Sequence, residues 1–404
     1  MKVLTLLTTL LVLSSTTLVA NEKASSLNTY LSDKKQEQFN FDYDKNEADA
    51  SILRDSWIAP ILLNYNYTKS NPYTQTQVSE SAAIRMDQPI FQSGGIYYGI
   101  KFAKYSKKYA DYSVDVAKRK LIKDAISILM QIKQKDLQIS RQELQIQNSE
   151  INLKFKKEQY LNGQLDSGFL DNAIIERNFV IQNLYDIETA KERLISTFSA
   201  LSDLDYKIAT TPHLELLDKE EFLKHNLILK RAGSQIQRDE FAKDVTVAKY
   251  LPQVSLTAGY NWTKTDSTVA VFGSPERDYY DYGFRASMPL NINTFRDIES
   301  SRIDYLKSKV VSQDKEIELI ALFTQVMHNL KNLEKKKLLS LENKEIYSKL
   351  LEDTKNLFSA GYKTQYDVDT LENSVNIAQL DAKIYEIDKQ VELLSLYEMY
   401  VNVQ

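Results

Sequence analysis

The chain has 404 residues and a formal net charge of −4, with acidic and basic side chains mixed along its length. Because no basic stripe rises above this background, the composition argues against a nucleic-acid partner. Cysteine is absent, which excludes disulfides, thiolate metal sites and cysteine nucleophiles, and only ten glycines and seven prolines punctuate the chain, so its elements must be long.

Residues 1–20 have the pattern of a secretory signal peptide. Lys2 precedes an apolar core at residues 3–13, and Ala20 is a small residue suited to cleavage. No later run approaches the ~20 apolar residues that a membrane-spanning helix needs. The sequence therefore predicts an exported protein without helical membrane anchors.

The rest of the chain repeats one plan. Three landmarks recur at an offset of 200 or 198 residues: Arg85 with Arg285, Pro89 with Pro289, and Gly163 with Gly361. The segment "YNYTKS" likewise recurs as "YNWTKT". A shared offset predicts a tandem duplication, with a first repeat at residues 21–210 and a second at 211–404.

Each repeat is predicted to contain two strands, because apolar and polar residues alternate there with a period of two. The predicted strands are residues 58–69, 79–90, 251–264 and 278–290. Such alternation also suits a half-buried sheet of a soluble protein. Strands near the ~9–11 residues of a tilted transmembrane strand, their outward aromatic residues and the signal peptide favour a membrane sheet. Four strands cannot close a barrel when the smallest use eight, so several chains would have to share one.

Long helices follow the strands. Residues 97–161 and 295–358 would form helices of about 98 and 96 Å at 1.5 Å per residue. Shorter helices are predicted at residues 166–202, 219–249 and 364–401. We expect the first two of these to stack end to end beside a long helix, and residues before Trp57 to stack with the last.

The first long helix carries two apolar stripes. One repeats every seven residues from Ile132 through Ile139 and Ile146, and the other contains Leu137 and Leu144. Five residues separate the stripes, which places them ~140° apart on the helix. This spacing predicts a neighbour on each side of the helix, as in the wall of a tube.

These features resemble the TolC-like outer-membrane efflux proteins over essentially the whole mature chain. The resemblance rests on the duplicated strand-pair and long-helix halves, on "YLPQVSLTAGYNW", and above all on "FSAGYKTQYDVDTLENSVNIAQ". In the last segment Gly361, Thr364, Asp367 and Val368 match the spacing typical of the family.

The resemblance implies a duplicated, mainly helical fold with membrane strands. Three chains would form a homotrimer with a 12-stranded β-barrel, four strands per chain, continuous with a long α-helical barrel. It also implies a location in the outer membrane of a Gram-negative bacterium, in contact with outer-membrane lipid and extending into the periplasm. The implied function is a passive exit duct of a tripartite efflux or type I secretion system, docked to a periplasmic adaptor and an inner-membrane pump. No cofactor or metal is implied.

In the family, the turn before the last helix contributes to a closed periplasmic aperture. Carried over by position, Asp367 matches the aperture aspartate, Lys363 a basic residue of the closed state, and Phe358 a tyrosine. The second aspartate of the family falls at Thr370, with Asp369 adjacent. The alternative is that Asp367 only begins the final helix, where an acid complements the helix dipole.

Further sites are expected at the turns and at the ends of the strands. Gly163, Gly168 and Gly361 suggest tight helix turns suited to adaptor docking. The residues Arg85, Pro89, Arg285 and Pro289 are predicted to mark the junction of barrel and tunnel, where proline would end each strand.

The sequence contains no glycine-rich phosphate loop, nucleophile elbow or metal-binding helix motif that would indicate an enzyme. His213, His225 and His328 lie scattered without ligand spacing. The competing interpretation is a soluble periplasmic coiled-coil adaptor or a structural rod. That interpretation explains the helices, but it does not explain tyrosine-rich strands at the same place in both halves.

Overall fold

The computed structural model describes residues 25–71, 76–267 and 276–401. The predicted signal peptide lies outside these residues. Eight helices are described: α1 (Ser25–Asn28), α2 (Asp33–Asp55), α3 (Gly95–Leu161), α4 (Ser167–Leu201), α5 (Lys219–Lys224), α6 (Leu227–Lys249), α7 (Thr294–Ser359) and α8 (Gln365–Tyr397). Within the described part of the chain, no helix combines the length and apolar character needed to cross a membrane.

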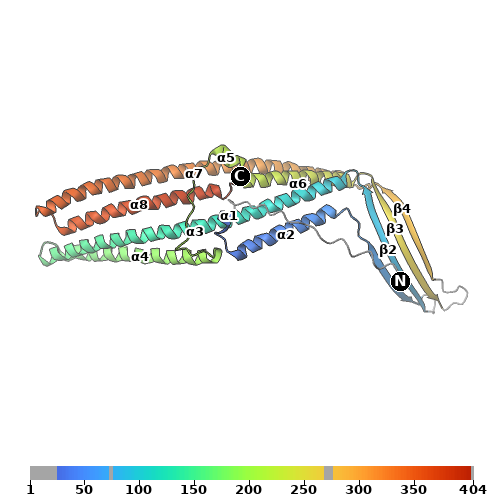
Figure 1. The fold of residues 1–404 in the computed structure, drawn as a ribbon, viewed down its shortest axis with the longest axis horizontal. Coiled ribbons are helices and arrows are strands. Elements are labelled where there is room, and N and C mark those ends of the chain that lie inside the picture. Colours follow the sequence, from blue (N-terminus) through green and yellow to red (C-terminus); the bar gives the residue numbers. More distant parts are fainter. Residues whose placement is uncertain (1–24, 72–75, 268–275, 402–404) are drawn as a thin grey trace.

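The helices form an elongated body with the sheet at one end (Figure 1). The two long helices, α3 of 67 residues and α7 of 66, run most of its length. Both α6 and α8 contact α3 and α7, whereas α2 and α4 contact α3. Helix α3 therefore has neighbours on two sides, as its two apolar stripes predicted.

The predicted stacking of the short helices is wrong in its pairing. Helix α2 follows α4 end to end, since the Ser32 amide donates to the Leu201 carbonyl at 2.9 Å. Helix α6 follows α8, since the Leu227 amide donates to the Met399 carbonyl at 2.8 Å. The cause is the linker after α4, which crosses α3 before α5 begins: Lys133 of α3 donates to the Ala209 carbonyl at 2.7 Å.

The helix predicted at residues 219–249 is divided into α5 and α6. The Asn226 side chain accepts hydrogen bonds from the amides of Ile228 and Leu229, at 2.9 and 3.3 Å. An asparagine in this position begins a new helix rather than continuing the old one. The division therefore lies at His225 and Asn226, where α6 meets the end of α8.

The core lies where the short helices abut. Its largest cluster joins α3 to α4, α8 and the chain near α1, and its fully buried members include Leu31, Ile126, Leu129, Ile132 and Phe198. A smaller cluster joins α5, α7 and α8 around Phe222, Phe323, Val326 and Leu396. Burying such side chains stabilises a fold by roughly 1.5–3 kcal/mol each, so the middle of the body is its most firmly packed level.

The sheet contains four antiparallel strands in the order β1-β2-β3-β4. They are β1 (Leu62–Ser70), β2 (Gln77–Phe91), β3 (Gln253–Ser267) and β4 (Arg277–Ser287). The central pair, β2 and β3, joins the two sequence repeats. Among the described residues, strands β1 and β4 each have one unpaired edge.

Pro89 does not end its strand as predicted, because β2 continues to Phe91 through a register shift between these two residues. The strand tolerates proline here because its pairing with β1 stops at Arg85. Pro289, by contrast, lies two residues beyond the end of β4.

Candidate functional site

The tips of the two helical hairpins share one backbone geometry. Gly163 and Gly361 follow α3 and α7 with φ of 70° and 82°, in the left-handed region that favours glycine. The amides of Gln164 and Tyr362 donate back to the carbonyls of Gln159 and Leu357, each at 2.9 Å. Both turns are therefore Schellman motifs.

The first residues after each turn differ between the halves. Before α4, Asp166 accepts from the Gly168 amide at 2.8 Å. Before α8, Thr364 and Asp367 form a capping box, in which each side chain accepts from the backbone amide of the other residue. A carboxylate is bound to the backbone at both tips, but only the second hairpin has a reciprocal capping box.

The Asp367 carboxylate is held by its own helix end. Its Oδ2 accepts from the backbone amide and from the hydroxyl of Thr364, both at 2.9 Å. Lys363 Nζ lies 3.8 Å from its Oδ1, with both side chains more than 40% exposed. The hydrogen bond from the Thr364 backbone is the main cause that lowers the pKa of Asp367. The carboxylate is therefore a fixed negative charge at neutral pH, whatever further role it has.

The other predicted aperture residues lie on the same hairpin without converging on Asp367. Asp369 accepts from the Gln365 side chain at 2.6 Å, and the Thr370 hydroxyl donates to the Tyr366 carbonyl at 2.8 Å. Phe358 is exposed near the end of α7. Within one chain these side chains form no closed ring.

A polar ladder joins α8 to α3 from the core toward the tips. In the three contacts nearest the core, α3 residues spaced seven apart each bind a residue of α8. These pairs are Gln134 with Asp388 at 2.5 Å, Arg141 with Asp381 at 2.8 Å, and Asn148 with Asn373 at 2.8 Å. Near the tips, Tyr366 donates to Glu158 at 2.9 Å.

Burial is the main cause that raises the pKa of both Asp381 and Asp388. Arg141 opposes the shift at Asp381, and the hydrogen bond from Gln134 opposes it at Asp388. The ladder therefore carries two carboxylates that are less stable in their charged form than an exposed aspartate is.

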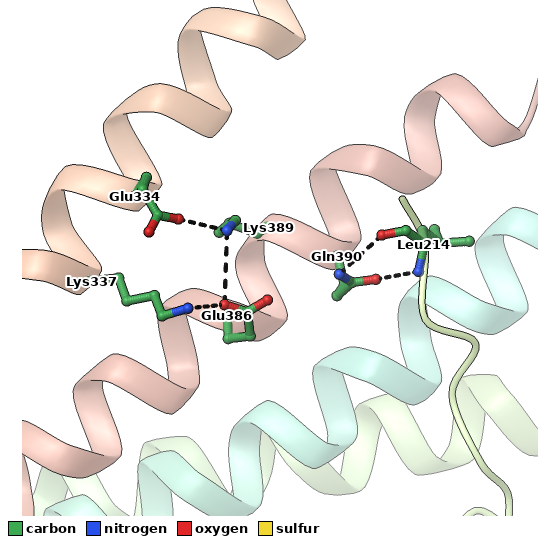
Figure 2. Close-up of polar contacts among 6 residues, drawn as sticks. All are labelled: Leu214, Glu334, Lys337, Glu386, Lys389 and Gln390. Carbon is green, nitrogen blue, oxygen red and sulfur yellow. Dashed lines mark hydrogen bonds and ion pairs between the residues drawn. The ribbon is translucent and has the colours of Figure 1, made fainter. Parts of the chain in front are cut away.

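Charged side chains also join α8 to α7, and a glutamine joins α8 to the linker (Figure 2). Lys337 of α7 lies 2.5 Å from Glu386, and Lys389 lies 2.6 Å from Glu334. The next residue of α8 after Lys389 is Gln390, which accepts from the Leu214 amide at 2.7 Å and donates to the Leu214 carbonyl at 3.3 Å. Helix α8 is thus fastened on three sides by polar contacts.

At the sheet, the predicted junction residues occupy one polar face. Arg85, Gly259 and Asp281 lie in one row across β2, β3 and β4. Arg85 reaches over the glycine to within 4.0 Å of Asp281, and a Cβ atom at Gly259 would come within 2.8 Å of that carboxylate. Arg285 is opposite Ser255 and has no ion pair among the described residues. The two arginines therefore share a face but not an environment.

The opposite face of the sheet is apolar and exposed. Tyr280, Tyr282 and Phe284 of β4 are 76%, 81% and 79% exposed, and Leu63 of β1 is 73% exposed. Few soluble monomers expose a contiguous apolar patch of this kind, which ordinarily marks an interaction with a membrane or another protein.

Sequence reasoning missed the ladder between α3 and α8. Its α3 members, Gln134, Arg141 and Asn148, follow the apolar stripe of Ile132, Ile139 and Ile146 at an offset of two residues. The seven-residue repeat of polar side chains was the available signal. Its partners could not be read from the sequence, because they lie more than 200 residues away.

The residues that the structure describes contain no group of three or more His, Asp or Glu placed to hold a metal ion.

No protein-family model and no curated protein matches the sequence. Solved structures do match. The VceC outer-membrane protein of Vibrio cholerae is 13% identical with a TM-score of 0.72, covering 93% of this chain and 95% of that one. The CmeC outer-membrane channel of Campylobacter jejuni is 12% identical with a TM-score of 0.71, covering 93% of this chain and 84% of that one. The chain has the TolC-like outer-membrane channel fold.

A third match is the open state of the MtrE outer-membrane channel of Neisseria gonorrhoeae, 11% identical with a TM-score of 0.65, covering 92% of this chain and 87% of that one. The predicted fold class, a mainly helical chain of the TolC-like fold with four strands, is confirmed. The trimeric 12-stranded barrel belongs to an assembly of TolC-like chains and stays a prediction.

Proposed function

We propose that this chain is the outer-membrane exit duct of a tripartite efflux or type I secretion system, conducting substrates passively across the periplasm and the outer membrane of a Gram-negative bacterium. The observation that carries the proposal is the sheet, which exposes tyrosine and phenylalanine on one face and Arg85 and Asp281 on the other. An apolar outer face and a polar inner face are what a channel wall in a membrane requires.

The open edges of the sheet support a homotrimer. Strands β1 and β4 each leave a row of backbone groups without a partner in the described part of the chain, and lipid cannot satisfy these groups. Three copies would supply twelve strands and close the barrel. Exposed apolar residues of α7, such as Val310 and Ile317, would then pack against the neighbouring copy, whose α2 and α4 expose Phe41 and Phe179.

The hairpin tips would form the periplasmic end of the duct. Asp367 and Lys363, with Phe358, Asp369 and Thr370, are the residues we propose to line its aperture. The turns at Gly163, Gly168 and Gly361 are proposed as the docking points of a periplasmic adaptor that links the duct to an inner-membrane pump. The support is their position on exposed turns at the end of the body away from the sheet (Figure 1).

Membrane fractionation and single-channel recording test this function together. We expect the protein in the outer-membrane fraction, as a trimer that conducts ions after reconstitution into planar bilayers. A protein found only in the periplasmic fraction, without conductance, would instead support a soluble coiled-coil adaptor or a structural rod. Identifying the pump that co-purifies with the trimer would define the class of substrate.

A further inference from the structure

The apolar face of the sheet contains a shallow hollow that crosses β1, β2 and β3. Ala82 of β2 lies in one row between Tyr65 of β1 and Trp262 of β3. A small side chain between two large ones leaves a depression of about 330 Å³, also lined by Ile84 and Tyr260. Its volume is at the lower end of the ~300–1,000 Å³ usual for small-molecule sites.

The aromatic walls of the hollow have fixed polar ends. The Tyr65 hydroxyl donates to Glu80 at 3.3 Å, and the Trp262 indole N–H donates to Glu276 at 2.8 Å. Beside them, the Tyr260 hydroxyl donates to Asp278 at 3.0 Å. Among the described residues, these three carboxylates form no ion pairs.

The polarity of this face changes in a consistent direction along the strands. From Trp262 toward Leu256 the same face of β3 carries Tyr260 and Ala258, whereas the next residue of that face beyond Trp262 is Lys264. Aromatic side chains with one apolar and one polar end are enriched where a membrane sheet leaves the hydrocarbon layer. The hollow therefore lies at a boundary between an apolar band and a charged rim.

We propose that this hollow binds one membrane lipid, with the end of an acyl chain nearest the headgroup resting on Ala82 between Tyr65 and Trp262. Hydrogen-bond donors of the headgroup, hydroxyl or ammonium, would then lie beside Glu80 and Glu276. The occupant is a lipid rather than a protein, because the lining of the hollow is mainly apolar and the carboxylates lie only on its rim side. This inference rests on the proposed membrane location of the sheet.

Trp262 provides a native probe, since the chain has only two tryptophans. The W57F variant leaves Trp262 as the single emitter. It is reconstituted into vesicles of phosphatidylethanolamine and phosphatidylglycerol, whose headgroups carry ammonium and hydroxyl donors, with acyl chains brominated either near the carbonyl or near the chain end. We expect shallow bromines to quench Trp262 more strongly than deep ones, and A82L in the same background to reduce this quenching by filling the hollow.

A258L is the matched control, because it adds the same bulk on the same face of the sheet, outside the hollow. It should leave the quenching of Trp262 unchanged. Equal quenching in W57F and in W57F with A82L would overturn the lipid site, as would stronger quenching by deep than by shallow bromines.

A further variant separates this outcome from failure of the proposed function. Y282W, made in a chain that also carries W57F and W262F, places the only indole on the same exposed face, opposite Ala258 and farther from the rim than Trp262. Deep bromines should quench it. If neither depth quenches it, the sheet is not in lipid, and the proposed function falls together with the lipid site.

Discussion

Substitutions at Asp367 and Thr364 separate two roles of the second hairpin tip. The Asp367 carboxylate caps α8, and we propose that it also carries charge into the periplasmic aperture. D367N keeps an oxygen that can accept from the Thr364 amide but removes the charge. T364V keeps the shape of the side chain but removes the hydroxyl that caps α8, and it leaves the charge in place.

The capping contribution follows from the hydrogen bonds. Losing a side-chain cap costs about 0.5–2 kcal/mol, and the exposure of this helix end places T364V near the lower half of that range, at about 1 kcal/mol. The ion pair with Lys363 adds little, because both side chains are largely exposed. We therefore expect T364V to destabilise the tip, and D367N to change its stability by only a few tenths of a kcal/mol.

The electrostatic contribution has the opposite pattern. Three Asp367 carboxylates converging on one axis would favour cations and repel anions. D367N should therefore lower the cation selectivity of the trimer, measured as the reversal potential in a salt gradient, while T364V should leave it unchanged. Unchanged selectivity in D367N, with wild-type conductance, would refute the aperture role and leave capping as the only function.

The pH dependence of the cap has a defined sign. The folded state lowers the pKa of Asp367, so its stabilising contribution is present above the ordinary carboxyl pKa and is lost as pH falls through the lowered value. D367N should abolish this acid-dependent loss, as followed by hydrogen exchange at the start of α8.

Three further predictions concern the stability of the body. G361A should destabilise the fold by about 1–2 kcal/mol, because the φ of Gly361 is 82°. G233A should stabilise it by up to about 1 kcal/mol, because Gly233 lies in the interior of α6 with open space around it. Thermal unfolding compares the two variants. Q390A removes two hydrogen bonds to Leu214, worth about 1–3 kcal/mol, so exchange at the Leu214 amide should accelerate roughly 10- to 100-fold, and unchanged exchange would contradict the clamp. Burial raises the pKa of Asp388, so the native state binds the proton of this carboxyl more tightly than the unfolded state does. Stability should therefore fall as pH rises from the ordinary carboxyl pKa through the raised value. D388N should flatten this dependence in denaturant titrations, and an unaltered pH dependence would assign it to another group.

The apolar periodicity and the positions of glycine and proline were enough to predict the long helices, because both features depend on local sequence. Helix α3 ends at Leu161 and α7 at Ser359, each within a residue of its predicted end, since a glycine in the left-handed conformation follows closely. The sequence predicts helix α2 only as a stacking partner formed by residues before Trp57, without bounds. Its mean polarity hides the single buried face around Phe39.

The stacking of the short helices could not be predicted from length. Helices α2 and α6 each have 23 residues, and α4 and α8 have 35 and 33. Either of the two short helices, α2 or α6, therefore fills the same length beside a long helix when it stacks on α4 or on α8. The linker between the repeats decides the pairing. Side chains of distant helices bind the backbone of this linker and fix its course. Lys133 binds the Ala209 carbonyl and Gln390 binds Leu214 (Figure 2), and neither contact follows a helical or strand period.

The duplicated junction residues show why equal sequence does not give equal environment. The order β1-β2-β3-β4 makes β2 a central strand and β4 an edge strand, so positions related by the repeat have different neighbours. Arg85 faces Gly259 and reaches Asp281, whereas Arg285 has a partner strand on one side only. Pro89 can remain within β2 because β1 has already ended beside it, while Pro289 lies beyond the edge strand, where no ladder hydrogen bond is lost. In a closed barrel β4 would gain β1 of the next copy as its neighbour, so the environment of Arg285, unlike that of Arg85, would be completed only by assembly.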